Sequence, residues 1–135
     1  MSREPILVVD DLIAPIPGDS PGGEPVTFVL RTELDELRKE INPDDFDEND
    51  PVRPTELKKA DWKGIIRKTT DLLRTQSKDL LLAARLTEAV TKQFGFAGFA
   101  EALTLLRRMT DECWDYLHPA IEDDDLEVRA GQFNW

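Results

Sequence analysis

The amino-acid sequence predicts an all-α fold, a compact antiparallel bundle of about four to six helices. Apolar residues of the second half recur at intervals of three and four, the spacing that places side chains on one face of a helix. No stretch of useful length alternates apolar and polar residues as a half-buried strand would. A chain of 135 residues, 40% of them hydrophobic, can bury its own core, so we expect residues 1–135 to form a single domain.

The first two helices are predicted from spacing and from the residues at their ends. Apolar residues spaced by four, three and four predict a helix over 32–41, and Asn42-Pro43 ends it because the residue before a proline avoids the helical region. A second helix is predicted to begin near Asp61, whose carboxylate can accept hydrogen bonds from the free amides of a first turn. Trp62 begins the apolar face of this helix.

The third and fourth helices are predicted to pack as an antiparallel pair, with the second helix completing a three-helix core. Ser77 is expected to cap the third helix, and Gly95 to end it in the left-handed conformation that glycine tolerates. The fourth helix is expected over 97–117, where His118-Pro119 stops it. Its apolar face is expected to contain Phe99, Ala100, Leu103, Leu106, Met109, Cys113, Trp114 and Leu117.

A last amphipathic segment follows a run of acidic residues. It contains Leu126, Val128, Ala130 and Phe133. Asp125 is the expected cap, because acidic side chains favour the start of a helix.

Residues 1–25 are expected to form an extended arm rich in proline and glycine. Residues 5–16 can form either a short strand or a single helical turn, and the stretch APIPGDSPGGEP that follows can continue neither. Its glycines raise the alternative of a phosphate-binding loop. Such a loop needs a lysine after the last glycine, where this chain has Glu24, so a structural arm is favoured.

Residues 42–54, the acidic loop, are predicted to be exposed. They contain five acids and one base together with three prolines. A calcium loop of the EF-hand type starting at Asp45 would need glycine at its sixth position, which is Asp50 here. A solvated run of charge is therefore favoured over a metal site. The five acids are Asp44, Asp45, Asp47, Glu48 and Asp50.

The sequence predicts no catalytic, cofactor-binding or metal-binding residue. Cys113 lies on an apolar helix face, where a thiol usually behaves as a small hydrophobic side chain. His118 is expected at a helix end, where an imidazole interacts favourably with the helix dipole. A hydrolase pairing these two is disfavoured, because five residues on a helix rotate a side chain by about 140°.

The charge distribution predicts how the chain meets its partners. A net charge of −11 argues against binding nucleic acid or an anionic membrane, and the apolar run over 6–9 is too short for a secretory or membrane-spanning segment. Residues 56–79 instead carry seven bases and four acids. Lys59, Lys63 and Arg67, the basic strip, recur every four residues and are expected on one exposed helix edge. The strip either pairs with the protein's own acids or docks an acidic partner.

Five stretches, taken in order, resemble the N-terminal domain of the ImpA/TssA proteins of bacterial type VI secretion. Their joint order over nearly the whole chain is more specific than any one of them. One departure is Phe28-Val29-Leu30, where the family's arm continues toward a Tyr-Asp-Pro helix start. The stretches are LIAPIPGDSPGGE (12–24), ELKKADWKGIIRKTTDLLRTQSKDLLLAARLTEA (56–89), GFAGFAEALTLLRRM (95–109), CWDYLHP (113–119) and EDDDLEVRAGQFNW (122–135).

The resemblance implies a non-enzymatic, cytoplasmic assembly protein that contacts baseplate, tube or sheath components. It also implies that the chain is a fragment of a longer protein, whose later regions form rings and provide self-association. The alternative is an acidic interaction module, or nucleic-acid mimic, unrelated to secretion, which would need its carboxylates in an ordered double row. The residues that recur in the stretches read as core, cap and stop residues: Trp62, Ser77, Asp79, Leu80, Trp114 and Pro119.

Overall fold

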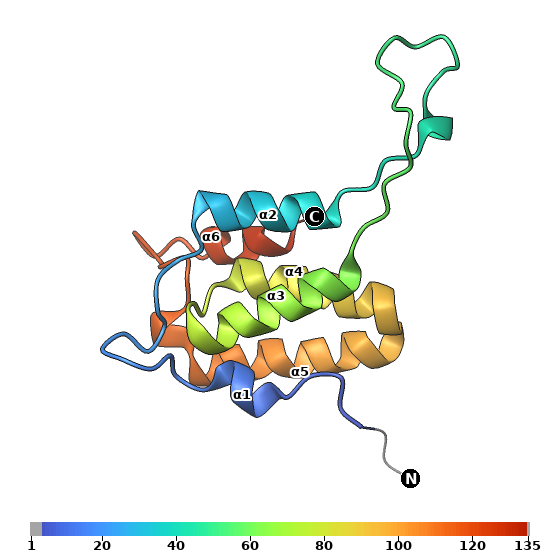
Figure 1. Ribbon diagram of the computed structural model, residues 1–135. Coiled ribbons are helices and arrows are strands. Elements are labelled where there is room, and N and C mark those ends of the chain that lie inside the picture. The colour runs from blue at the N-terminus through green and yellow to red at the C-terminus, as the bar shows by residue number, and fades with distance from the viewer. Residues whose placement is uncertain (1–3, 135) are drawn as a thin grey trace.

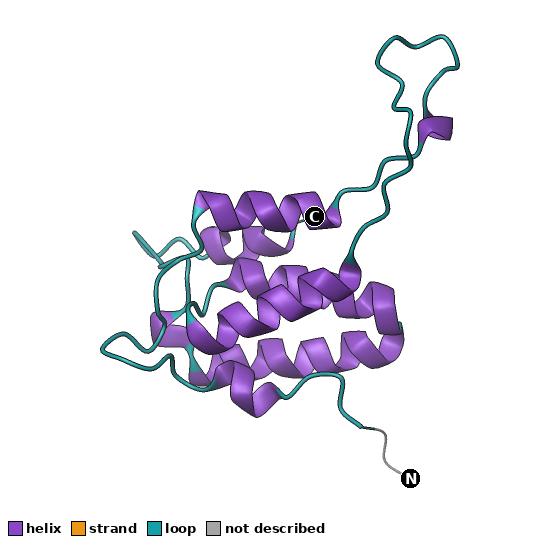
Figure 2. Cartoon of the chain, viewed as in Figure 1, coloured by secondary structure: helices purple, strands orange, loops and turns teal. Residues whose placement is uncertain are grey.

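The computed structural model describes residues 4–134, and its regular elements in that range are all helical (Figures 1 and 2). Residues 1–3 of the predicted N-terminal arm and Trp135 of the last stretch lie outside the described residues. The predicted all-α class is confirmed. The α-helices are α1 (Val9–Ile13), α2 (Phe28–Arg38), α3 (Trp62–Thr75), α4 (Leu80–Phe94), α5 (Phe96–Glu112) and α6 (Glu127–Ala130), and the 3-10 helices are η1 (Pro43–Asp45), η2 (Trp114–Tyr116) and η3 (Gly131–Phe133).

Helix α4 is the centre of the bundle. It packs antiparallel to α3 on one side and α5 on the other (Figure 1), which agrees with the predicted three-helix core. Gly95 joins α4 to α5 with a φ of 65°, the positive value predicted there that glycine tolerates, although its ψ of −143° lies outside the left-handed helical conformation. Most of α4 is buried, because other elements cover it on nearly every face: Leu80–Ala84 and Leu86–Val90 are all buried.

Helix α2 begins and ends earlier than the predicted 32–41. It begins at Phe28 because Thr27 Oγ1 accepts a hydrogen bond from the amide of Leu30 and caps the first turn. It ends at Arg38, whose guanidinium binds Glu88 of α4 through two bonds of 2.5 and 2.9 Å. The hydrogen bond to Glu88 raises the pKa of Arg38.

The other helix ends agree with the predictions in part. Asp61 caps α3 as predicted, with Oδ1 2.9 Å from the amide of Gly64. Ser77 does not cap α4. Asp79 does, because its Oδ1 accepts from the amide of Leu81. Helix α5 ends at Glu112 rather than at residue 117, and its last turn is followed by η2.

The chain's final helical segment is shorter than its apolar pattern suggests. Asp125 does not stand at the N-cap of α6, a position held by Leu126, although Asp125 Oδ1 accepts from the amide of Glu127. Only Glu127–Ala130 is α-helical, and η3 follows it directly.

The N-terminal arm is not extended throughout. Helix α1 interrupts it, and Leu7, Leu12, Ile13 and Ile16 around that helix are buried. Of the two conformations that the sequence left open for residues 5–16, the helical turn is the one formed. The first part of the arm therefore contributes to the core, packing on α3 and α5.

The acidic loop projects from the bundle beyond the end of α2 (Figure 1). Its base is closed by a bridge in which the amides and carbonyls of Ile41 and Lys58 exchange bonds of 2.7 and 2.8 Å. Its acids are exposed except Asp50, which is half-buried. The predicted exposure of this loop is thus observed, with η1 as its one helical turn among the described residues.

Residues 76–79, between α3 and α4, lie at a junction where distant parts of the chain meet. On one side the amide of Lys78 donates to the carbonyl of Gly22, and the amide of Val26 donates to Asp79 Oδ2. On the other side the amide of His118 donates to the carbonyl of Lys78. One short connection thereby joins the proline-glycine stretch, the start of α4 and the segment after α5.

The Lys78 side chain is fully buried at this junction. Its ammonium Nζ donates to the carbonyls of Leu12 in α1, at 2.7 Å, and Leu73 in the last turn of α3, at 2.5 Å. Both carbonyls lie in final helical turns, where cations are favoured by the helix dipole. Burial nevertheless disfavours the charged form and lowers the pKa of Lys78 to about 8.

This lowered pKa predicts that stability depends on pH. Between pH 8 and the ordinary 10.5 the unfolded chain keeps the Lys78 proton and the folded chain loses it, so stability rises with pH in this window. The stability gained by holding Lys78 in its neutral form is fully present above pH 10.5 and is lost as the pH falls through 8. Urea unfolding of the wild type and Lys78→Met at pH 7 and 10 should show a relative gain for the wild type of about 2–3 kcal/mol.

The control for this measurement is Lys92→Met, which removes an exposed lysine of α4. Its difference from the wild type should not change between the two pH values. A difference between the wild type and Lys78→Met that stays constant would contradict the assigned pKa.

Candidate functional site

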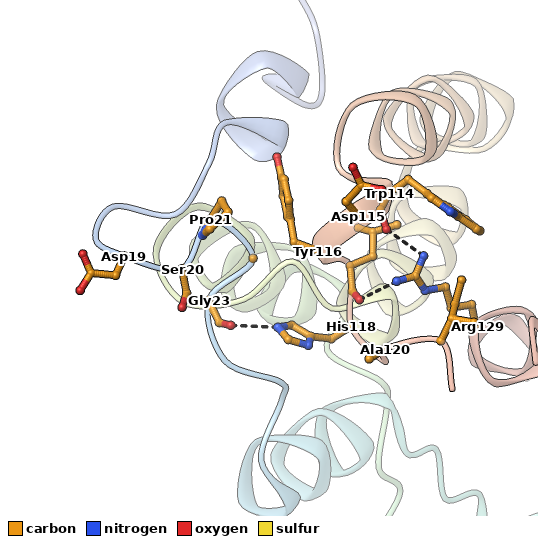
Figure 3. A pocket seen from close by; sticks show the side chains of 13 residues that line it. Asp19, Ser20, Pro21, Gly23, Trp114, Asp115, Tyr116, His118, Ala120 and Arg129 are labelled. Atoms are coloured by element: carbon orange, nitrogen blue, oxygen red, sulfur yellow. Dashed lines mark hydrogen bonds between the residues drawn. The ribbon is translucent and has the colours of Figure 1, made fainter. Parts of the chain in front are cut away.

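The junction pocket is a hollow of about 530 Å³ between the proline-glycine stretch and the segment after α5 (Figure 3). Residues 19–23 form one wall and residues 114–118 another, with Arg129 at the base. Polar groups that could suggest catalysis meet here: Ser20, Asp115 and His118. The sequence does not indicate that they meet, because Ser20 is more than ninety residues from Asp115 and His118 in the chain.

His118 is not placed as a base. It follows η2 instead of ending a helix, which corrects the prediction, and its Nε2 lies 2.9 Å from the carbonyl of Gly23. A carbonyl only accepts, so Nε2 carries a proton and donates it to Gly23. Figure 3 shows the imidazole directed to this carbonyl, with Asp19 pointing outward at the far edge of the loop. The geometry makes His118 a link between the two walls.

Cys113 is fully buried beneath the same segment, as predicted. Its Sγ lies 3.5 Å from the carbonyl of Ile13, among core side chains. A nucleophilic thiol needs an accessible and electropositive setting. The thiol here packs as a small apolar group.

Arg129 holds the chain around the junction pocket. Its guanidinium donates to the carbonyls of Trp114, Leu117 and Pro119 at 2.9–3.0 Å, and it lies 4.5 Å from the centre of the Trp114 ring. Burial lowers the pKa of Arg129. Trp114, which the sequence assigns to the core, is therefore partly exposed and stacked beneath a cation. In the sequence, Arg129 stands out only because it is the single basic residue within the apolar pattern of residues 126–133.

Removing the guanidinium of Arg129 should destabilise the fold. Arg129→Ala leaves three carbonyls without their donor, so we expect a loss of about 2–4 kcal/mol in urea unfolding. Arg129→Lys should recover only part of this, because an ammonium lacks the planar fork. Arg107→Ala, on the exposed face of α5, is the matched control and should change stability by less than about 0.5 kcal/mol. A wild-type stability for Arg129→Ala would contradict the assigned role.

The basic strip does not lie on a single helix edge. Lys63 and Arg67 are on α3, but Lys59 precedes the helix, three residues before Trp62. All three side chains are exposed. Other bases of this region pair with the protein's acids, as Lys68 does with Glu33. Within residues 4–134, no acid lies within ion-pair distance of the strip.

An apolar groove adjoins the basic strip, and the sequence analysis missed it. It encloses about 710 Å³ between the start of α3, the turn from α4 to α5, and the residues before α1. Lys63 and Arg67 stand on its wall, and Glu4 is its acidic member. In the sequence, the groove is indicated only by Phe94, a large apolar residue next to the helix-ending Gly95. In the structure this side chain is 47% exposed. The apolar lining consists of Pro5, Ile6, Ile66, Phe94 and Ala97.

Over residues 4–134, no three side chains of His, Cys, Asp or Glu are grouped so that they could hold a metal ion. In the same part of the chain, no helix is both long enough and apolar enough to cross a membrane.

The fold and these sites define an all-α domain with a packed polar junction at one place and an apolar groove with a basic edge at another. The family profile described as ImpA, N-terminal, type VI secretion system matches residues 13–135. The chain belongs to this family, and the resemblance seen in the sequence is confirmed. No curated protein matches the chain.

A solved structure supports the same assignment. It is the N-terminal domain, including the conserved ImpA_N region, of the TssA component of the type VI secretion system from Burkholderia cenocepacia. The identity is 34% and the TM-score 0.70, over 98% of this chain. The present chain spans 47% of the length of that one. This chain is therefore a component of a type VI secretion system.

Proposed function

We propose that this chain is a non-enzymatic assembly component that works in the bacterial cytoplasm by binding baseplate, tube or sheath proteins of the secretion machine. The observation that carries the proposal is the family match over 13–135 together with the TssA likeness. The junction pocket adds support, because its histidine and arginine are used to hold backbone carbonyls. Ring formation and self-association by later regions of a longer protein belong to the same proposal.

The basic strip is the proposed docking surface for a secretion partner. Lys59, Lys63 and Arg67 are exposed, carry one sign of charge and have no acidic partner among residues 4–134. In a chain of net charge −11 such a surface selects an acidic patch on a partner. Exposed charges of this kind mainly affect association rate and specificity.

A binding assay with purified baseplate, tube and sheath components tests the proposal. We expect the chain to be retained on at least one of them. Reversing Lys59, Lys63 and Arg67 to Glu should weaken that binding by about tenfold or more, with a steeper loss at low salt. Retention on none of the components, by this chain and by longer proteins that contain it, would refute the assembly role.

The matched control reverses three exposed bases elsewhere: Arg31 of α2, Lys92 of α4 and Arg107 of α5. Both triple variants have the same net charge, so a difference between them reports the position of the charges. Equal binding by the two triple variants would mean that the basic strip is a solvated face and not a docking surface.

A further inference from the structure

The acidic loop is built as a preformed projection. Asn42 caps η1 by accepting from the amide of Asp44, and Asp47 and Asp50 each accept from the amide two residues ahead. Arg53 closes the loop with a bond of 2.9 Å from Nε to the carbonyl of Pro43. Among the described residues, the hydrogen bonds of residues 42–57 join only members of that segment. The loop is ordered by its own side chains and makes no hydrogen bond to the bundle.

Phe46 gives this loop an apolar anchor. It is 37% exposed and lies between Asp45 and Asp47, directly after η1. It is not among the side chains that pack on the core. An aromatic residue flanked by acids on a protruding turn has the form of a ligand for an apolar hollow with a basic edge.

The apolar groove has the complementary form. Ile6, Ile66 and Phe94 provide apolar walls for an aromatic ring, and Lys63 and Arg67 present cations beside it. A ring placed in the groove would bring the neighbouring carboxylates toward these two cations. Two of the three charged residues that line the groove are cations and the third is Glu4, so the charge of the groove is opposite to that of the acidic loop, and both surfaces are partly apolar.

We propose that the acidic loop of one copy of this chain docks on the apolar groove and basic strip of a second copy, with Phe46 in the groove. A two-fold pair would use each loop and each groove once, so that the contact occurs twice per dimer. The inference goes beyond the proposed function, because it concerns two copies of this chain. It uses the same basic strip, so a second copy and a secretion component would compete for that surface.

The occupant is a second copy for two reasons. The bridge between Ile41 and Lys58 and the bond from the amide of Asp61 to the carbonyl of Leu37 direct the loop away from its own bundle (Figure 1). The repulsion between two chains of charge −11 is screened beyond about 8 Å at physiological ionic strength, whereas the docked charges lie in contact. Local attraction therefore decides the outcome.

Sedimentation velocity over a wide range of concentration tests the proposal. The wild type should shift from monomer to dimer as concentration rises. Phe46→Ala should raise the dissociation constant by about tenfold or more, because it removes the anchor. The control Phe28→Ala truncates a phenylalanine of α2 that is 81% exposed, and should dimerise as the wild type does.

A charge exchange makes the test specific for the two surfaces. One variant carries Asp45→Lys and Asp47→Lys, and the other carries Lys63→Glu and Arg67→Glu. Each should stay monomeric alone, because the two side chains that flank Phe46 then have the same sign as residues 63 and 67. Mixing them should restore a heterodimer, since both loop-to-strip contacts are again of opposite sign.

Three results would overturn the proposal: a wild type that stays monomeric at every concentration, a dimer that Phe46→Ala leaves unchanged, or a mixture that does not associate. The last result would mean that the loop of one copy does not pair with the strip of another. The loop variants keep the basic strip intact, so their binding to secretion components can be scored separately. Failure of this inference is therefore distinguishable from failure of the assembly role.

Discussion

The fold depends on one buried lysine. The Lys78 side chain binds carbonyls at the ends of α1 and α3, while its own amide and carbonyl bind Gly22 and His118. The ends of α1 and α3, the proline-glycine stretch and the segment after α5 are thereby held at one point. Burying the charge of Lys78 costs free energy, and the hydrogen bonds at the two helix ends offset only part of that cost, as the lowered pKa of Lys78 indicates. The position of α4, which begins two residues later, follows from this junction.

This constraint explains where function can reside. The residues around the junction pocket bond to backbone carbonyls, as Arg129 and His118 do, and so maintain the fold. The opposite situation holds at the start of α3, where Lys63 and Arg67 stand beside an apolar groove with no acid paired to them in the described chain. A surface whose charges and apolar groups are unused by the fold is the surface available to partners.

Some predictions that rest on local interactions were accurate. Asp61 caps its helix and Gly95 ends one, because a cap needs only the next few residues. Other predictions of helix ends failed. Asp79 replaces Ser77 as the cap of α4, since its second oxygen also binds the amide of Val26 from the arm. That pairing crosses more than fifty residues and leaves no trace in local pattern.

Helix α5 shows the same division. Its spacing correctly indicated an amphipathic helix, but Phe99 and Leu103, expected in the core, are partly exposed, and Ala102 and Leu105 are buried instead. The sequence by itself determined the helical class, the acidic loop and the family, because these follow from periodicity, charge and ordered motifs. Only the tertiary structure decided which face is buried and where the groove opens. Both depend on the angle at which helices pack, and side chains from several segments set that angle together.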